Sequence, residues 1–162
     1  MEKNDIAYIK QEIQVLLGSE CIKVGRACNL VWFSFVINGN EFALHIQSSF
    51  RITRNESILC ANLDMYEPKA ETLNNPSFNY EDFKWDIQGN NYFDEWILKS
   101  GNELQNERVK NIEISNLGNL VITFGNDITL EVFNNSSVSE CWRFFKLHSK
   151  NHIIVLGNEL ES

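Results

Sequence analysis

Apolar residues at the start of the chain recur every three or four positions, which is the period of an α-helix. Five of them fall on one face over about residues 5–17: Ile6, Ile9, Ile13, Leu16 and Leu17. Asn4 or Asp5 is expected to cap this helix, because a short polar side chain can accept a hydrogen bond from the first turn. Gly18 is expected to end it. We therefore predict an amphipathic N-terminal helix that packs one face on a core.

From about residue 21 to residue 66 the period falls to two, which is typical of half-buried strands. The alternation divides into four segments: 21–29, 30–37, 41–53 and 57–66. Asn38-Gly39 predicts a tight hairpin between the second and third segments, because both residues tolerate a positive φ. Ser48-Ser49 interrupts the third segment, and a bulge or bend is expected there. These features predict an antiparallel meander.

Residues 67–108 show no clean period and are rich in aromatic and acidic side chains. Both prolines of the chain, Pro68 and Pro76, lie in this segment. A helix is expected over about Tyr92–Leu104, with Gly101 weakening its end. The remainder is expected to be either a packed excursion or a functional loop.

The last part of the chain returns to strand alternation. Strands are predicted over four segments: 109–115, 120–125, 128–133 and 152–157. Residues 139–147 (SECWRFFKL) are expected to form a short helix or turn. The whole pattern predicts one α+β domain over residues 1–162, with the N-terminal helix on a largely antiparallel sheet or partly closed barrel. The irregular segment 67–108 then separates a strand meander at about 21–66 from a second strand group at about 109–157.

The net charge of −8 narrows the range of partners. Nucleic acids and anionic membrane surfaces bind clustered Lys and Arg, so we expect neither as a partner. A basic protein is compatible, because opposite potentials speed encounter. The sequence has no run of about 18 apolar residues and no apolar core of a secretory signal near its start. We therefore expect a cytoplasmic protein whose four cysteines are reduced and mostly buried.

The sequence lacks the motifs of the common metal, cofactor and nucleophile sites. It contains no CxxC, HExxH, GxSxG, GxGxxG or P-loop pattern. We therefore predict no metal ion, no cofactor and no catalytic residue.

Five charged or titratable residues are candidates for a polar cluster at one end of the sheet: His45, Arg51, Asp64, Glu140 and Arg143. If they surround an open pocket, the chain is an enzyme or a small-ligand binder. If they pair with one another, they form an internal ion-pair network that locks the end of the sheet, which is the interpretation we favour.

Several motifs resemble, in their order along the chain, those of a family of small uncharacterised bacterial cytosolic proteins: LHIQSSFRI, LDMYEP, LEVF, ECWRFF and HIIVLG. The resemblance spans most of residues 5–157 and is weakest over residues 70–108. It implies a fold and brings no established activity or catalytic residue. At the level of class, acidic proteins of this sort look like the immunity or accessory proteins found near bacterial toxins.

The leading interpretation is a non-enzymatic protein-binding module, with an immunity-type protein that masks a basic partner as one form of it. Seven residues are expected to make the partner-binding surface: Trp85, Asp86, Tyr92, Phe93, Asp94, Glu95 and Trp96. Aromatic anchors among charges suit an interface, although burial of the tryptophans is the competing explanation. A structural subunit of a homo-oligomer is a further alternative, and both a monomer and a homodimer are compatible with exposed strand edges.

Overall fold

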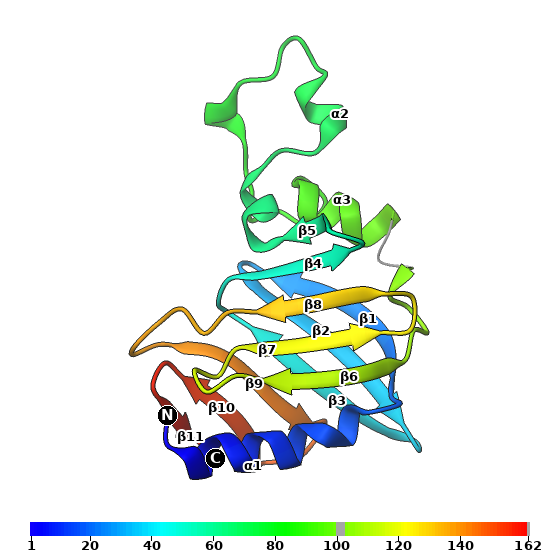
Figure 1. Ribbon diagram of the computed structural model, residues 1–162. Coiled ribbons are helices and arrows are strands. Elements are labelled where there is room, and N and C mark those ends of the chain that lie inside the picture. Colours follow the sequence, from blue (N-terminus) through cyan, green and yellow to red (C-terminus); the bar gives the residue numbers. More distant parts are fainter. Residues whose placement is uncertain (100–102, 162) are drawn as a thin grey trace.

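Two antiparallel sheets carry the strands, flanked by the N-terminal helix and by a helical middle segment (Figure 1). The computed structural model describes residues 1–99 and 103–161. Sheet A contains, in spatial order, β1 (Glu20–Ala27), β2 (Leu30–Ile37), β3 (Asn40–Ile46), β9 (Glu140–Lys146), β10 (His152–Leu156) and β11 (Glu159–Glu161). Sheet B contains β5 (Ser57–Ala61), β4 (Phe50–Arg54), β8 (Ile128–Val132), β7 (Leu120–Phe124) and β6 (Val109–Ile114). The predicted α+β class is confirmed, and within the described residues the two sheets do not close into a barrel.

The predicted N-terminal helix is confirmed as α1 (Lys3–Ile13), which tightens into the 3₁₀ turn η1 (Gln14–Leu16). Its core-facing residues are Ile6, Ile9, Ile13 and Leu16. The prediction of Asn4 or Asp5 as the cap is wrong. Glu2 occupies that position, and the Asp5 carboxylate accepts a hydrogen bond from the backbone N–H of Glu2 at 3.1 Å.

The predicted third strand is divided between the two sheets. β3 ends at Ile46 in sheet A, and β4 begins at Phe50 in sheet B. Between them, the backbone N–H groups of Gln47 and Ser48 both donate to the carbonyl of Cys141, at 2.9 and 3.1 Å. The predicted meander therefore splits: three of its strands lie in sheet A and two lie in sheet B.

Residues 139–147 do not form the predicted helix or turn. Most of this segment is β9, which pairs with β3 on one side and β10 on the other. Trp142 and Phe144 are buried on the core face, while Arg143 and Phe145 point to the outer face. Aromatic residues suit a pleated, half-buried surface, and that preference outweighs the helical spacing of the charged pair.

The core lies between the facing sheets. The rings of Phe35 on β2 and Phe124 on β7 stack with their centroids 6.4 Å apart. Trp142 is fully buried, and its indole N–H donates to the carbonyl of Gly118 at 2.9 Å. Burial of this large side chain therefore leaves no unpaired indole donor.

The middle segment, residues 62–99, projects from one end of the sandwich, and we call it the excursion (Figure 1). It contains four short elements: η2 (Asn62–Tyr66), α2 (Ala70–Leu73), η3 (Tyr80–Asp82) and α3 (Tyr92–Lys99). The predicted helix over Tyr92–Leu104 is confirmed at its start, and residues 100–102 of that prediction lie outside the described residues. None of the helices in residues 1–99 and 103–161 has the length and apolar character needed to span a membrane.

Candidate functional site

The excursion is fastened to sheet A by a buried ion pair. Arg26, near the end of β1, donates from Nε and Nη2 to the two carboxylate oxygens of Asp94 on α3, each at 2.6 Å. The two side chains are only 1% and 8% exposed. A planar guanidinium facing a carboxylate in this bidentate manner is the strongest geometry available to such a pair.

Arg26 also donates hydrogen bonds to three backbone carbonyls, two of which lie in the excursion and are reached by Nη2, while Nη1 reaches that of Cys28. Its guanidinium reaches the carbonyls of Trp85 and Ile87 at 3.1 and 3.2 Å, and that of Cys28 at 3.0 Å. Asp94 in turn accepts from the backbone N–H of Gly89 at 2.8 Å. Because the two buried charges are hydrogen-bonded to each other and to the surrounding backbone, they stabilise the packing of the segment from Trp85 to Asp94 against β1.

Arg26 was not among the residues predicted from the sequence to have a role. Arg26 pairs in register with Val31, whose side chain is fully buried, and so it occupies a core-facing position of β1. A charged residue at a position where the strand alternation expects an apolar one predicts a buried ion pair, because a buried charge requires a partner.

The seven residues predicted to bind a partner divide into a buried part and an accessible part. Phe93 and Trp96 are buried in the core, and Asp94 is held by Arg26. Glu95 is engaged locally, by Lys99 and by the backbone N–H of Ala70 at 3.2 Å.

The accessible part consists of Trp85, Asp86 and Tyr92. Asp86 and Tyr92 are exposed, and Trp85 is half-buried against Tyr66 with ring centroids 4.9 Å apart. The burial of Phe93 and Trp96 agrees with the competing structural explanation for the aromatic residues of α3.

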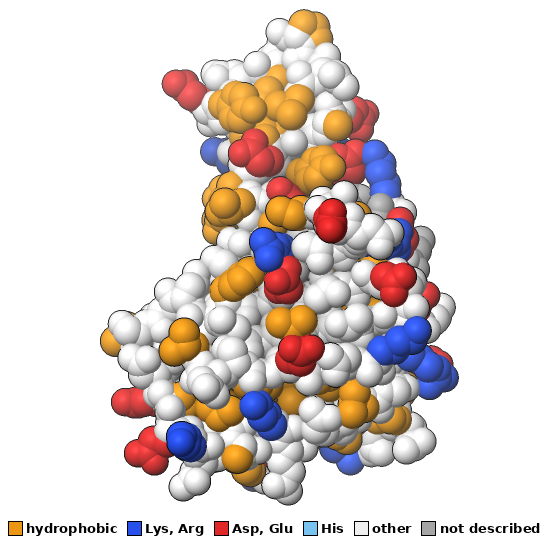
Figure 2. All heavy atoms as spheres, in the orientation of Figure 1, with side chains coloured by type: hydrophobic (Ala, Val, Ile, Leu, Met, Phe, Trp, Pro, Cys, Tyr) orange, Lys and Arg blue, Asp and Glu red, His pale blue; other side chains and the backbone are white. Residues whose placement is uncertain are grey.

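The excursion presents exposed apolar side chains besides these residues (Figure 2). Seven of the thirteen exposed large apolar or tyrosine side chains in the described residues belong to it: Leu63, Tyr66, Leu73, Tyr80, Ile87, Tyr92 and Leu98. Acidic side chains lie among them, and five are exposed: Glu67, Glu71, Glu81, Asp82 and Asp86. We call these two sets together the excursion surface.

Three of the five residues of the predicted polar cluster meet on the outer face of sheet A. His45 on β3 stands opposite Arg143 on β9, and Arg143 forms a bidentate pair with Glu140, with its Nε donating at 2.6 Å. The hydrogen bond from Arg143 lowers the pKa of Glu140. Burial, followed by the positive charge of Arg143, lowers the pKa of His45.

The other two residues of that cluster lie elsewhere. Arg51 donates to Glu131 on the outer face of sheet B, with Nη2 at 3.0 Å from one carboxylate oxygen. Asp64 accepts from the backbone N–H of Ala61 at 2.8 Å, at the start of η2. The five groups therefore occupy three separate places, and each charged group is engaged with a structural partner.

Phe145 separates the two histidines of sheet A. The ring of His152 stacks on it at 4.2 Å between centroids, and the ring of His45 meets it edge-on at 4.9 Å. Within the described part of the chain, no group of three His, Cys, Asp or Glu side chains is placed to hold a metal ion. Comparison of the chain with protein-family models, with curated proteins and with solved structures gives no match.

Proposed function

We propose that the chain is a non-enzymatic protein-binding module that contacts a basic partner through the excursion surface. The observation that carries this proposal is the gathering of exposed apolar side chains on the excursion, among exposed carboxylates. Contiguous apolar surface rimmed by charge is typical of protein interaction sites.

The charge of the excursion indicates the chemistry of the partner. Residues 62–99 contain eight acidic residues against three lysines. Asp94 and Glu95 are already paired, to Arg26 and Lys99, and Glu71 lies 3.8 Å from Lys69. The other exposed carboxylates are available to a partner: Glu67, Glu81, Asp82 and Asp86. A partner surface with Lys or Arg around an apolar centre is complementary to this arrangement.

The excursion is also held in one shape before a partner arrives. Beyond the Arg26–Asp94 pair, Phe78 and Tyr80 meet edge to face at 5.1 Å between centroids. An isolated antiparallel β-bridge between Pro68 and Asn91 joins the two sides of the excursion. A preorganised surface loses less conformational entropy on binding than a flexible loop does. In an immunity-type protein, such a surface would cover the basic residues of a toxin.

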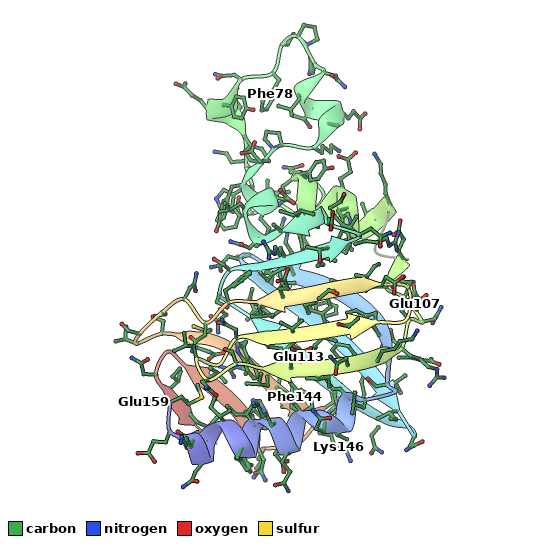
Figure 3. All side chains as sticks on the ribbon, in the orientation of Figure 1. Phe78, Glu107, Glu113, Phe144, Lys146 and Glu159 are labelled. Carbon is green, nitrogen blue, oxygen red and sulfur yellow. The ribbon has the colours of Figure 1, made fainter. Side chains whose placement is uncertain are left out.

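The test is partner capture from the source organism with two charge-matched double variants. Glu81→Lys/Asp86→Lys alters the excursion surface, and Glu113→Lys/Glu159→Lys makes the same change of charge elsewhere. Glu113 and Glu159 lie in the part of the molecule away from the excursion (Figure 3). All four side chains are exposed, so we expect both variants to melt at the temperature of the unaltered protein.

We expect the unaltered protein and the Glu113/Glu159 variant to capture the same protein, identified by mass spectrometry. The Glu81/Asp86 variant should lose it, and raising the salt concentration should weaken the capture. Leu73→Ser/Ile87→Ser, which alters two exposed apolar side chains of the same surface, should lose the partner without changing the charge. Equal capture by all the variants would show that the excursion surface is not the interface.

A further inference from the structure

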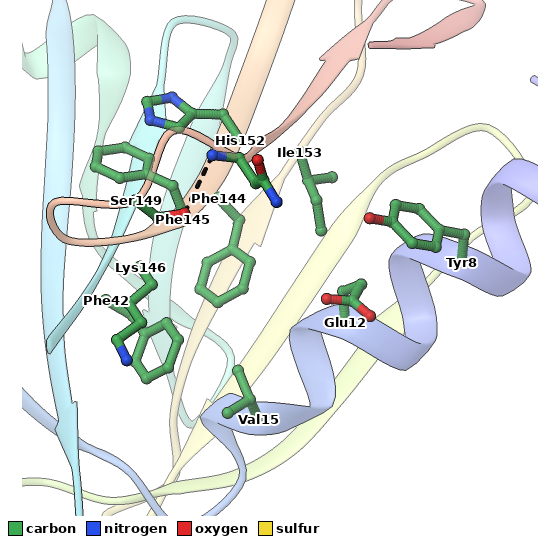
Figure 4. A pocket seen from close by; sticks show the side chains of 11 residues that line it. Tyr8, Glu12, Val15, Phe42, Phe144, Phe145, Lys146, Ser149, His152 and Ile153 are labelled. Atoms are coloured by element: carbon green, nitrogen blue, oxygen red, sulfur yellow. Dashed lines mark hydrogen bonds between the residues drawn. The ribbon is translucent and has the colours of Figure 1, made fainter. Parts of the chain in front are cut away.

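A cavity of about 550 Å³ opens between α1 and the β9–β10 hairpin (Figure 4). Helix α1 lies at the end of the sandwich opposite the excursion (Figure 1). The volume of the cavity is within the range of small-molecule sites.

The floor of the cavity is aromatic. Phe42 on β3 and Phe144 on β9 stack with centroids 5.7 Å apart and planes 13° from parallel. Both rings are at least nine-tenths buried, yet both line the cavity, as does Ile153 on β10. An apolar ligand body placed here would remove this floor from water.

Lys146 breaks the pattern of the strand that carries it. Core-facing positions of β9 hold Trp142 and Phe144, and the next position in that phase holds Lys146, in register with Phe42. Lys146 lines the cavity, and it makes no ion pair with any residue of the described chain. A cation beside two phenyl rings at a cavity mouth can bind the anionic end of a ligand whose other end is apolar.

The opposite wall comes from α1 and from η1, which continues it. Tyr8, Glu12 and Val15 follow one another at helical spacing on a stripe separate from the core-facing one, and all three are exposed and line the cavity. Tyr8 and Val15 extend the apolar surface, and the Tyr8 hydroxyl can donate a hydrogen bond. The Glu12 carboxylate disfavours a second negative charge on the ligand.

We propose that this cavity binds a small monocarboxylate with an aromatic or other apolar body. The carboxylate pairs with Lys146, with the Ser149 hydroxyl at the same rim as a further donor, and the body covers Phe42 and Phe144. The site is independent of the excursion surface, so its test does not depend on the protein-binding proposal.

The experiment is a titration of the ¹⁵N-labelled protein with three probes of similar size: 3-phenylpropionate, 3-phenylpropanol and 3-phenylpropylamine. We expect saturable shifts of the amides of Val15, Lys146 and Ile153 with the carboxylate. The affinities for the alcohol and for the amine should be lower than that for the acid by about fivefold or more, because neither forms an ion pair with Lys146.

Lys146→Glu should lower the affinity for 3-phenylpropionate about tenfold and make 3-phenylpropylamine the probe that binds most tightly. Lys110→Glu is the matched control. Lys110 is also an exposed lysine on a strand, but it lies at the start of β6 in the other sheet. Lys110→Glu should leave all three affinities unchanged. Val15→Trp, which places a large ring at an exposed wall position, should abolish binding of the carboxylate without touching the core.

Three results would overturn the proposal. One is the absence of saturable binding by 3-phenylpropionate at concentrations up to about 10 mM, which corresponds to a binding free energy too small for a built site. Another is equal affinity for the acid and the alcohol. The last is a set of shifts located on the excursion and not around the cavity.

Discussion

Two arginine–carboxylate ion pairs can be compared. One lies where the excursion meets sheet A, and the other lies on the outer face of sheet B. Arg26 and Asp94 join β1 to α3 with side chains 1% and 8% exposed. Arg51 and Glu131 join β4 to β8 with side chains 44% and 24% exposed. Both pairs are bidentate, and both unite residues far apart in sequence.

Burial makes the difference between the two pairs. A solvated pair gains little, because water screens the attraction and would itself solvate the separated charges. A buried pair has given up that solvation, so removal of one partner leaves an uncompensated charge in the interior. We therefore expect the Arg26–Asp94 pair to be required for the packing of the excursion on sheet A. We expect the Arg51–Glu131 pair to contribute little to the stability of sheet B.

The largest effect is expected from Asp94→Leu. This change leaves the Arg26 guanidinium buried without its carboxylate, and we expect it to lower the free energy of unfolding by about 3–5 kcal/mol. Urea denaturation measures this loss. The double variant Arg26→Met/Asp94→Leu should recover part of it, because no charge remains buried. If the double variant is no more stable than the single one, the stranded charge is not the cause.

A smaller effect at the same junction is expected from Gly25→Ala. A Cβ at Gly25 would lie 2.2 Å from the Trp32 ring, which crosses over this glycine from β2. The ring must shift, and we expect the unfolding free energy to fall by about 1–3 kcal/mol. Adding Trp32→Leu should restore part of the stability, since a smaller side chain leaves room for the methyl group. Calorimetry of the two variants measures this, and equal loss in both would contradict the steric explanation.

Two groups on the outer face of sheet A, His45 and Glu140, should make the stability of the protein depend on pH. Because the pKa of His45 is lowered from its ordinary value of 6.5, the unfolded chain binds this proton more readily than the folded one. Its contribution to stability is complete above pH 6.5 and is lost as the pH falls through the folded pKa. The lowered pKa of Glu140 adds a further loss below its ordinary value of 4.5.

Melting temperatures of the unaltered protein should therefore fall between pH 7 and pH 5, and those of His45→Gln should fall less. His148→Gln is the control, because His148 is exposed in the turn after β9. A His45→Gln variant with the same pH dependence as the unaltered protein would rule out His45 as the source of the effect.

The smallest effect is expected from Arg51→Ala. Arg51 also lies over the ring of Phe133, 5.4 Å from its centroid, but its side chain remains exposed to water. We expect the melting temperature to stay within experimental error of the unaltered protein. A loss comparable to that of Asp94→Leu would show that burial does not decide the difference between the two pairs.

Local signals in the sequence predicted local structure well. Asn38 and Gly39 adopt φ values of 50° and 74°, so the hairpin between β2 and β3 forms with the positive φ angles that these two residues tolerate. The break at Ser48-Ser49 was also placed correctly, because two polar residues interrupt the alternation there. The pattern did not reveal that the chain changes sheets at this break, since alternation looks the same in either sheet.

Long-range contacts were beyond the reach of sequence patterns. Arg26 and Asp94 are 68 positions apart, and no periodicity connects them. The polar cluster shows the same limit: His45 and Arg143 meet because β3 pairs with β9, whereas Arg51 lies beyond the change of sheet. Which charges meet depends on strand order, and strand order is set by packing over the whole core.

The position of β9 between β3 and β10 has a consequence for synthesis on the ribosome. β1, β2 and β3 emerge early and can pair in sequence, but β3 then keeps one row of backbone N–H and C=O groups free. That edge stays open until residues 140–146 leave the exit tunnel and insert beside it. A nascent chain in this state presents an unpaired strand with Phe42, Leu44 and Ile46 uncovered, which is a template for association with other chains. Because this strand is synthesised late, we expect the nascent chain to be most prone to association in the interval before the strand inserts.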